Sequence, residues 1–570
     1  MTARALRRSA ALLAAAAGVV LSAGTASAAP SREPGLRTVV DAASMGVDQV
    51  QAERQSAILA EEDQRLLTLV ASVRPGSGPY VQTLDGVDTL VLTAGGAPYG
   101  LADLIALGAV HPEADGAALL TEHVFVAPGA HLALVAPGTE LRLASSGTGF
   151  TSIVAWKAQL DLTGSALQPL RVVGWDDRAQ RPDETPVDGR AYVRDVSGDM
   201  RVSYVQANHL GFWAGRTSGV AWTGNSSTPA TGAIVASRFS DNHYGAFASQ
   251  GEDLSVEQSV FTGNAVDGLS LHRSTAKTTV TDSTASHNGR HGFSADQGSE
   301  VVTFDQVTSA ANTGYGIFFS GAPLAVAQSA GGASLRNYGQ LDVAGGTLAD
   351  NGRAGLRVVD GSQVTVSGTT VRGNLDGIDL AGTTAPTRVT GTTVTGDQRF
   401  GITVTGGTAT VQHNQVRGAV TGVRVRDADV NVQRNTLTAT GHGISVVGRA
   451  TGSSLTGNTV SGRGPSAVDT YRIADDASVV TRANNVDAWD VDRDNSTYWR
   501  EFIPNHPMLL LWVVVLGAPL ALTLRGRRRR VAPGTAPYRD DIKRQWAAPR
   551  RVDVGRRVAT GRHMAPGGQA

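Results

Sequence analysis

The 570-residue sequence contains no cysteine. Disulfide bonds and thiolate metal sites are therefore excluded, and packing must stabilise the fold. The histidines at 287 and 291 are four residues apart, but they lie on an irregular Asn-Gly turn rather than on a helix. We therefore expect no metal site, and we expect no cofactor.

Long uncharged apolar runs are also scarce, and the first of them is N-terminal. Residues 1–28 combine early arginines, an apolar run from Ala10 to Ala23 and a small-residue end at Ala26-Ser27-Ala28. This pattern predicts a signal peptide cleaved after Ala28, and a short N-terminal anchor helix is the alternative. The mature protein is thus predicted to act outside the cytoplasm.

The second apolar run, residues 507–524, is free of charge and predicts one transmembrane helix. Residues 491–506 form a juxtamembrane linker, and residues 525–570 carry 13 basic against 3 acidic residues. The basic tail predicts a cytoplasmic C-terminus near anionic lipids, and hence a single-pass protein of the cell membrane. The alternative for residues 507–524 is a buried core helix. For the basic tail, nucleic-acid binding is a weaker alternative than the position near anionic lipids.

An excess of charge of one sign is absent from the whole chain, whose formal net charge is zero. The signal and the tail hide an asymmetry, because the rest has 34 basic and 47 acidic residues, a net of −13. That balance disfavours indiscriminate binding to polyanions such as nucleic acid. Residues 336–463 alone have a net charge of +4, so a local basic strip or an ordinary solvated face is expected there.

The chain does contain a repeat, in which a short apolar strand follows a glycine at intervals of mostly 21 to 24 residues. The glycines are Gly245, Gly268, Gly292, Gly316, Gly355, Gly377, Gly401, Gly422 and Gly443. An asparagine commonly precedes the glycine by three or four residues, as at Asn242, Asn264, Asn288, Asn312, Asn351 and Asn374. A unit this short must stack on its neighbours to bury an apolar face, so the period predicts a solenoid.

Within each repeat the first and third residues after the glycine are apolar or small, as at Leu269, Leu271, Ile378 and Leu380. Alternation along a strand points these residues inward and the second and fourth residues outward. The β-branched strands and the lack of a leucine-rich signature favour an all-β parallel β-helix over a leucine-rich repeat.

The solenoid is predicted to span residues 79–490, in roughly 16 turns and about 75 Å at ~4.8 Å per strand. Its charged and proline-rich loop at 176–188 is expected to project from the stack. Residues 29–78 show apolar positions at helical spacing and predict a helical N-terminal segment. This segment is expected to cap or brace the solenoid, and binding to a partner is the alternative.

The outward columns must supply any chemistry. They place His272 beside Asp296 on neighbouring turns, flanked by Ser270, Arg273 and Gln297. A carboxylate fixes the tautomer of an imidazole and raises its basicity, as a general base requires. A chance polar pair is the alternative, and a Ser270-His272-Asp296 hydrolase triad lacks a nucleophile elbow.

Further polar and aromatic residues lie at the corners before the strands, where they are predicted to rim a groove that binds sugars or to be plain corner packing. They are His209, Trp213, His243, Tyr244 and His291.

The stretch from about Val124 to Gly316 resembles the right-handed parallel β-helix uronate epimerases of the mannuronan C5-epimerase type. The matching residues include Pro128-Gly129-Ala130, Glu140-Leu141-Arg142-Leu143, Val173-Gly174-Trp175, His209-Leu210-Gly211-Phe212 and His291-Gly292. The family signature Tyr-Gly-x-Asp-Pro-His-Asp falls on residues 267–273, where Gly268 and His272 are kept. The two aspartates are replaced by Ser270 and Arg273, and the arginine of the next turn by Gln297.

The resemblance implies that His272 removes the C5 proton of a uronate and that Arg273 replaces the lost arginine. It implies an acidic cell-surface or exported polysaccharide as partner and an epimerase-like or lyase-like activity. Loss of the charged partners weakens transition-state stabilisation, so a non-catalytic glycan-binding protein is a rival. A scaffold or adhesin for a protein partner is the third hypothesis.

Overall fold

A computed structural model of the chain describes residues 49–147, 149–322, 339–474 and 478–492. The predicted signal peptide, transmembrane helix and basic tail lie outside these residues. No helix within the described ranges is long and apolar enough to cross a membrane.

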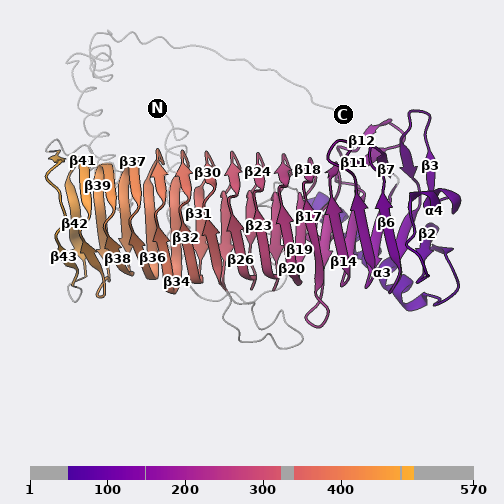
Figure 1. Cartoon of the computed structure of the whole chain (residues 1–570), viewed down its shortest axis with the longest axis horizontal. Coiled ribbons are helices and arrows are strands. Elements are labelled where there is room, and N and C mark those ends of the chain that lie inside the picture. The colour runs from indigo at the N-terminus through magenta and orange to yellow at the C-terminus, as the bar shows by residue number, and fades with distance from the viewer. Residues whose placement is uncertain (1–48, 148, 323–338, 475–477, 493–570) are drawn as a thin grey trace, which may run out of the picture. The chain divides into compact units, whose positions relative to one another are not determined.

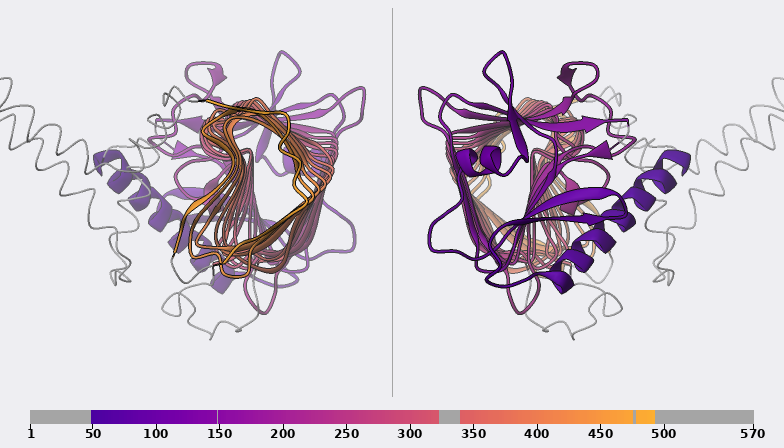
Figure 2. Two further views of the ribbon diagram at one scale, coloured as in Figure 1. Left: turned by 90° about the vertical axis from the view of Figure 1, so that its left-hand side faces the viewer. Right: turned by 90° about the vertical axis from the view of Figure 1, so that its right-hand side faces the viewer.

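The described part is a right-handed parallel β-helix of about 15 turns with an N-terminal helix, close to the predicted 16 (Figure 1). Its coils stack as three parallel sheets around one apolar core, which Figure 2 shows end-on. Most coils contribute one strand to each sheet, and in four coils a long strand continues through a corner into a second sheet.

The first sheet carries the candidate site. Its own strands are β2 (Val87–Leu92), β5 (His123–Val126), β9 (Ser152–Trp156), β13 (Tyr192–Val196), β16 (Val220–Thr223), β19 (Ala246–Ser249), β22 (Leu269–His272), β25 (Phe293–Ala295), β28 (Ile317–Ser320), β31 (Ala354–Val359) and β42 (Ser466–Ile473). Four long strands run through a corner and pair in two sheets: β34 (Asp376–Thr390), β36 (Phe400–Gln412), β37 (Gln415–Arg426) and β39 (Thr436–Gly448).

The second sheet consists of β6 (His131–Val135), β10 (Gln159–Thr163), β14 (Asp199–Ser203), β17 (Ala230–Val235), β20 (Gly251–Glu257), β23 (Ala276–Thr281), β26 (Glu300–Asp305), β29 (Leu341–Ala344), β32 (Ser362–Ser367), β38 (Asp429–Gln433), β40 (Ser454–Thr456) and β43 (Val480–Arg482).

The third sheet has mostly three-residue strands. They are β4 (Ala118–Leu120), β7 (Glu140–Ser146), β11 (Leu170–Asp176), β15 (Val205–Asn208), β18 (Arg238–Ser240), β21 (Val260–Thr262), β24 (Thr284–Ser286), β27 (Thr308–Ala310), β30 (Thr347–Ala349), β33 (Thr370–Arg372), β35 (Thr393–Thr395), β41 (Thr459–Gly464) and β44 (Trp489–Val491). The remaining strands pair antiparallel near the N-terminal coils: β1 (Tyr80–Leu84), β3 (Val110–Pro112), β8 (Gly149–Phe150) and β12 (Arg181–Pro182).

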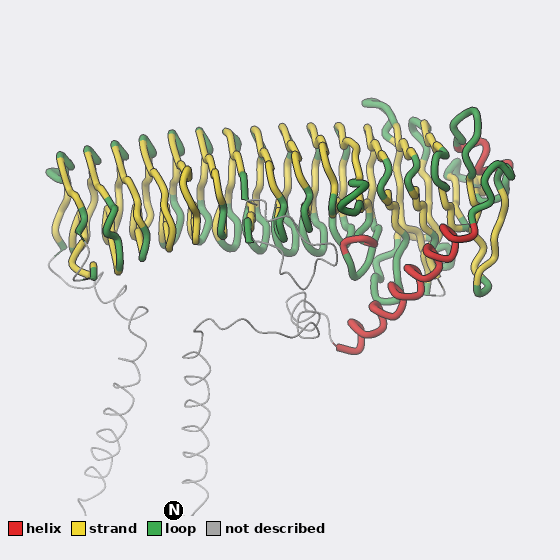
Figure 3. Tube along the Cα trace, turned by 90° about the horizontal axis from the view of Figure 1, so that it is seen from below, coloured by secondary structure: helices red, strands yellow, loops and turns green. Residues whose placement is uncertain are grey.

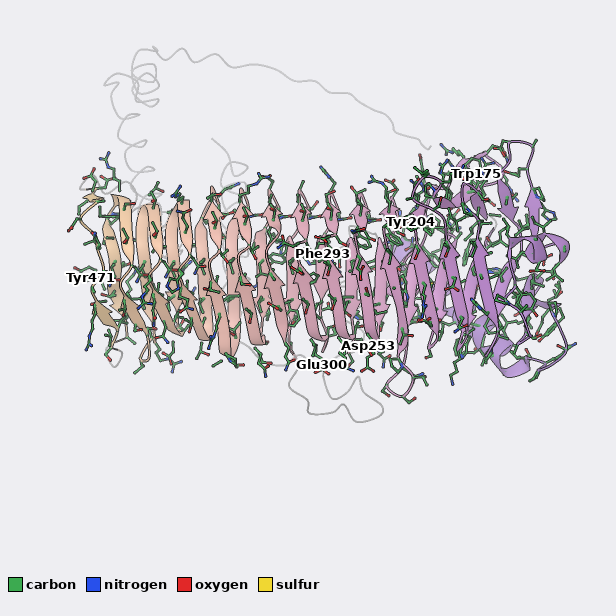
Figure 4. All side chains as sticks on the ribbon, in the orientation of Figure 1. Trp175, Tyr204, Asp253, Phe293, Glu300 and Tyr471 are labelled. Atoms are coloured by element: carbon green, nitrogen blue, oxygen red, sulfur yellow. The ribbon has the colours of Figure 1, made fainter. Side chains whose placement is uncertain are left out.

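The predicted inward columns form the core. Leu269, Leu271, Ile378 and Leu380 are at most 2% exposed, and their strands pair in parallel. Side chains therefore alternate between the core and the outside as the sequence pattern predicts. In Figure 4 Phe293 lies in the middle of the stack and Tyr471, 91% exposed, at its C-terminal end.

The recurring asparagines form a buried ladder at the corner after the third-sheet strands. The Asn242 oxygen accepts a hydrogen bond from the Leu210 N–H, and from Asn264 to Asn374 each side-chain oxygen accepts one from the backbone N–H of the preceding ladder residue. The ladder ends at Asp397, and a second ladder begins at Asn414 on the corner before these strands. Buried asparagines satisfy the turn backbone in this way, and they fix where each first-sheet strand begins.

Helix α3 (Gln49–Ser72) confirms the predicted helical segment, and it lies along the outside of the N-terminal coils (Figure 3). A short helix, α4 (Leu101–Ala106), and a 3-10 helix, η1 (Gly215–Thr217), complete the described helices. The 176–188 loop is exposed at its tip, but Asp183 is buried at its base and accepts a hydrogen bond from Ser145.

Candidate functional site

The outward face of the first sheet brings His272 and Asp296 together. His272 ends β22, and Asp296 follows β25 on the next coil, where its N–H donates to the Leu271 carbonyl. The imidazole Nδ1 lies 2.5 Å from the carboxylate Oδ1, and each side chain is 28% exposed. The sequence predicted this pair, because the coils stack in register.

The pair has the geometry of a general base and its orienting group. The carboxylate accepts a hydrogen bond from Nδ1–H, which leaves the lone pair of His272 on Nε2. No hydrogen bond to Nε2 is present among the described residues. The ring of Phe247 packs on the imidazole with a centroid distance of 5.7 Å, which holds the ring orientation. Nε2 is thus available to take a proton from a ligand.

An ion pair between Arg290 and the buried Asp267 carboxylate lies on the same outward face, because Ser294, two residues before Asp296, donates to Asp267 at 2.7 Å. Arg290 Nε and one terminal nitrogen donate to the two Asp267 oxygens at 2.8 and 2.6 Å. The Asp267 carboxylate is fully buried; burial alone raises its pKa, but Arg290 outweighs this and holds the pKa at about 2. Arg290 is 40% exposed, and its own pKa is raised by Asp267, with smaller contributions from Tyr244 and Asp296.

Sequence reasoning missed Arg290, because it lies two residues before the repeat glycine and outside the outward columns. The available signal was a spacing of 23 residues between the aspartate before one glycine and the arginine of the next coil. The same spacing joins Asp376 to Arg399, whose side chains pair in the same bidentate way.

Ser270 points outward but is only 4% exposed. The Ser294 hydroxyl donates toward Ser270 at 3.1 Å and toward Asp267 at 2.7 Å, and no hydrogen bond links Ser270 to His272 in the described structure. The Ser270 hydroxyl is therefore part of a buried network with Ser294 and the Asp267 carboxylate, and it does not face a ligand. The arrangement is not that of a Ser-His-Asp triad.

Arg273 and Gln297 follow His272 and Asp296 at equivalent turns of adjacent coils. Both have left-handed backbone conformations, with φ of 43° and 50°, and both are partly buried. The Gln297 Oε1 atom is buried and has no hydrogen-bond partner among the described residues. These two side chains flank the pair as predicted, whereas their roles toward a ligand stay predictions.

The predicted corner residues divide into two groups. Tyr244 lies at the site, with its ring centroid 5.7 Å from that of Phe247. Trp213 is 9% exposed and packs in the cluster beneath α3, so its ring is not open to a sugar. His209 hydrogen-bonds to Asn208 on the third-sheet corner, where burial lowers its pKa, and no contact joins it to His272 within the described ranges.

The remaining corner histidines support the site without facing it. His243 Nε2 lies 3.1 Å from the Trp213 carbonyl, and His291 Nδ1 accepts the Tyr315 N–H at 3.1 Å. Burial lowers the pKa of both imidazoles to about 4, so both are neutral near pH 7. No set of three or more His, Cys, Asp or Glu side chains in the described ranges is arranged to hold a metal.

The first sheet continues beyond the pair as a row of arginines, acids and aromatic rings. The Arg353 guanidinium lies 5.5 Å from the Tyr315 ring, and Arg357 pairs with Asp379. Phe400 is flanked by Arg399 at 5.4 Å and Arg424 at 4.6 Å. Arg357 and Arg399 on this face are paired with Asp379 and Asp376, so both expectations for residues 336–463, a basic strip and an ordinary solvated face, stay predictions.

Comparisons with known proteins bear on the fold. Residues 213–326 match a family model described as right handed beta helix region, and residues 323–468 match one described as periplasmic copper-binding protein (NosD). No individual curated protein matches significantly. The structure is similar to that of the periplasmic alginate epimerase AlgG, with a TM-score of 0.44 and 14% identity over 70% of this chain and 85% of that one.

Two further similar structures have related names. The Azotobacter vinelandii mannuronan C-5 epimerase AlgE6 A-module has a TM-score of 0.38 and 17% identity, covering 68% of this chain and 99% of that one. The alginate lyase from Paenibacillus sp. str. FPU-7 has a TM-score of 0.25 and 13% identity, covering 61% and 93%. The match to the right handed beta helix model agrees with the predicted fold.

Proposed function

We propose that this chain binds an acidic polysaccharide on its first sheet and removes the C5 proton of a uronate residue there. The supporting observation is the Nδ1 contact of His272 with Asp296, which leaves Nε2 free on the outward face that also carries the Arg290–Asp267 ion pair. A base and a held cation on one face suit proton abstraction alpha to a carboxylate, because the cation stabilises the charge that develops on the carboxylate oxygens.

The reaction balances with groups of this chain and water. Nε2 of His272 takes the C5 proton, and the C5–H electron pair moves into the C5–C6 bond to give an enolate, whose charge Arg290 stabilises. A proton returned by water to the opposite face of C5 inverts that centre. Expulsion of O4 instead breaks the C4–O4 bond, leaves a C4–C5 double bond and releases O4 with a proton from water.

Arg290 takes the role that the resemblance assigns to Arg273. Two hydrogen bonds to the Asp267 carboxylate hold the Arg290 side chain, which stays 40% exposed, so it is oriented before a ligand binds. Arg273 has no ion pair in the described structure and lies on a left-handed turn. We therefore assign carboxylate binding first to Arg290.

Deuterium exchange tests the proposal. The full-length protein, purified in detergent because its sequence predicts a membrane segment, is incubated with polymannuronate in heavy water, and C5 deuteration is followed by NMR. We expect exchange that His272→Gln abolishes and Asp296→Asn lowers by about 10²-fold. The matched control is His209→Gln, a half-buried histidine on another corner, which leaves the exchange unchanged.

A second candidate is non-catalytic glycan binding. The observation that favours it is the replacement of two signature aspartates by Ser270 and Arg273. Retention of the polymer without deuteration, insensitive to His272→Gln, would establish this candidate and overturn the catalytic one. Absence of both binding and exchange would favour a scaffold for a protein partner.

We further propose that the β-helix acts outside the cytoplasm on a single membrane anchor at residues 507–524, with residues 525–570 inside. The uncharged run followed by arginines supports this orientation. Protease added to intact cells should degrade the β-helix and spare an epitope at the C-terminus. Release of the protein by alkaline carbonate would contradict the anchor.

A further inference from the structure

Arginine recurs on every second coil at one corner of the solenoid. The position lies two residues before the repeat glycine, where the chain enters the first sheet. On successive coils it holds Val266, Arg290, Gly314, Arg353, Leu375 and Arg399. The backbone N–H of each of these residues donates to the carbonyl of the one before it, so the six stack in register. Arg290, Arg353 and Arg399 thus form an arginine row along the long axis of the rod (Figure 1).

Two arginines of the row are held by carboxylates of the preceding coil. Nε and Nη2 of Arg290 donate to both oxygens of Asp267, and those of Arg399 donate to both oxygens of Asp376. Each aspartate directly precedes the repeat glycine of its coil. In both arginines Nη1 makes no hydrogen bond within the described ranges, and the side chains are 40% and 54% exposed. Both guanidinium groups are therefore oriented and keep N–H donors for a ligand.

Arg353 is held from the equivalent position by an aromatic ring. Its guanidinium lies 5.5 Å from the centroid of Tyr315 and donates to the Tyr315 hydroxyl at 3.4 Å. Arg353 is exposed and forms no ion pair with the residues that the structure describes, so its charge is not compensated. The rings of Tyr315, His291 and Phe318 lie 5.1 to 5.6 Å apart, and Tyr315 and Phe318 are partly exposed. Aromatic surface thus lies beside the cations.

The spacing of the arginine row indicates its ligand. Arg290 and Arg353 are two strand spacings apart, as are Arg353 and Arg399, which is about 9.6 Å at ~4.8 Å per strand. This distance is close to the length of two hexopyranose rings linked through O1 and O4. In an extended chain of uronates, successive carboxylates point to opposite sides, so every second carboxylate faces the same way. Guanidinium groups bind such carboxylates through paired N–H donors, and aromatic rings suit the apolar faces of the sugars.

We propose that an extended acidic polysaccharide lies along the rod over the arginine row and places every second carboxylate on Arg290, Arg353 and Arg399. This inference rests on the acidic polymer of the proposed function and specifies how it is bound, whereas it does not require proton transfer at His272. Recognition depends on the carboxylates, so a neutral polymer of the same linkage is not bound.

Binding of mannuronate chains of increasing length tests the inference. Full-length His272→Gln protein in detergent is titrated by calorimetry with each chain and with neutral mannose chains of the same linkage. Affinity should rise with length and level off once the chain covers the four strand spacings from Arg290 to Arg399, about 19 Å at ~4.8 Å each. Equal affinity for the neutral chains, or affinity independent of length, would overturn the row.

The same titrations separate this inference from the proposed function. Length-dependent binding without C5 exchange in the wild type would support the arginine row and overturn only the catalytic function. Exchange in the wild type together with length-independent binding would overturn only the row. No binding of any mannuronate chain would overturn both.

Two variants sharpen the test. Arg353→Gln removes the arginine that has no ion pair and should weaken binding of chains that span the row roughly five-fold. The double change Asp376→Asn with Arg399→Gln removes a second guanidinium without leaving a lone carboxylate, and it should weaken binding to a similar extent. The matched control is Arg388→Gln, an exposed arginine on the second sheet, which should leave affinity unchanged. Unchanged affinity in both row variants, or an equal loss in the control, would overturn the row.

Discussion

The N-terminal coils and the coils after Phe247 share one fold but treat the same outward face differently. Where α3 covers the sheet, the outward column holds Val91, Phe125 and Val154. Further along, the same register holds Ser270 and Ser294, which are buried beside the Asp267 carboxylate, and then the partly exposed Arg357 and Asp379. An outward position thus takes an apolar side chain where a helix packs on it and a polar one where a charged group or solvent lies over it.

The interface between α3 and the first sheet is not purely apolar. Its buried charged groups make this region more sensitive to substitution and pH than the coils further along. Beneath α3, Arg65 donates to Glu62 at 2.6 and 2.7 Å, and Tyr192 hydrogen-bonds to the same carboxylate. Glu62 is 6% exposed. Burial lowers the pKa of the nearby His123 to about 4, Arg65 lowers it further, and Glu62 acts in the opposite direction. The coils further along carry asparagine ladders at their corners in addition to the apolar core.

The largest expected effect is therefore at Glu62. Glu62→Ala leaves Arg65 buried without its partner, which costs about 3–5 kcal/mol of stability in this region. Hydrogen exchange should accelerate in α3 and in β13 but not beyond β28. Glu61→Ala, an exposed neighbour on the same helix, is the control, and equal effects of the two changes would show that the buried network does not hold the helix.

The same network predicts a pH dependence. Burial raises the pKa of Glu62, but Arg65 outweighs it, so the folded value is about 2 against 4.5 for a free side chain. A depressed carboxyl pKa stabilises the fold above 4.5, and this contribution is lost as the pH falls toward 2. Exchange in α3 should thus increase in that window in the wild type and much less in Glu62→Ala.

A smaller effect is expected in the regular coils. Asn312 accepts from the N–H and side chain of Asn288 and donates to the Ala285 carbonyl, Ser309 and Asn351. Asn312→Ala should cost about 3 kcal/mol, because it leaves several buried groups unpaired. Chemical denaturation measures this cost, and Asn208→Ala, a partly buried asparagine outside the ladder, should cost much less.

The repeat was predictable because glycine spacing and strand alternation are visible within short stretches of sequence. Together they determine which residues face the core and which residues of adjacent coils lie side by side. This is why His272 and Asp296 could be paired from the sequence. The bracing of the solenoid by the helical segment was predicted, but the face that the helix covers was not, because the sequence of residues 36–74 does not specify which sheet its apolar side meets. Arg290 was missed for a related reason. Its role depends on the burial of Asp267, and the pattern of polar residues in the sequence does not show which of them are buried.

The smallest expected effect is at Asp397, where a substitution should raise the stability of the protein rather than lower it. It occupies the last step of the first ladder, where Oδ1 accepts from Asn374 while Oδ2 is buried without a partner. Burial raises its pKa from 3.8 to about 6, so the folded state holds a proton that the unfolded state releases. A raised carboxyl pKa leaves stability unaffected below 3.8 and lowers it as the pH rises through 6.

Asp397→Asn should then stabilise the protein by roughly 1–3 kcal/mol at pH 7, with the gain vanishing near pH 4. Denaturation of both proteins across this range measures the difference, and a gain independent of pH would assign the effect to packing at the corner instead of to the carboxylate.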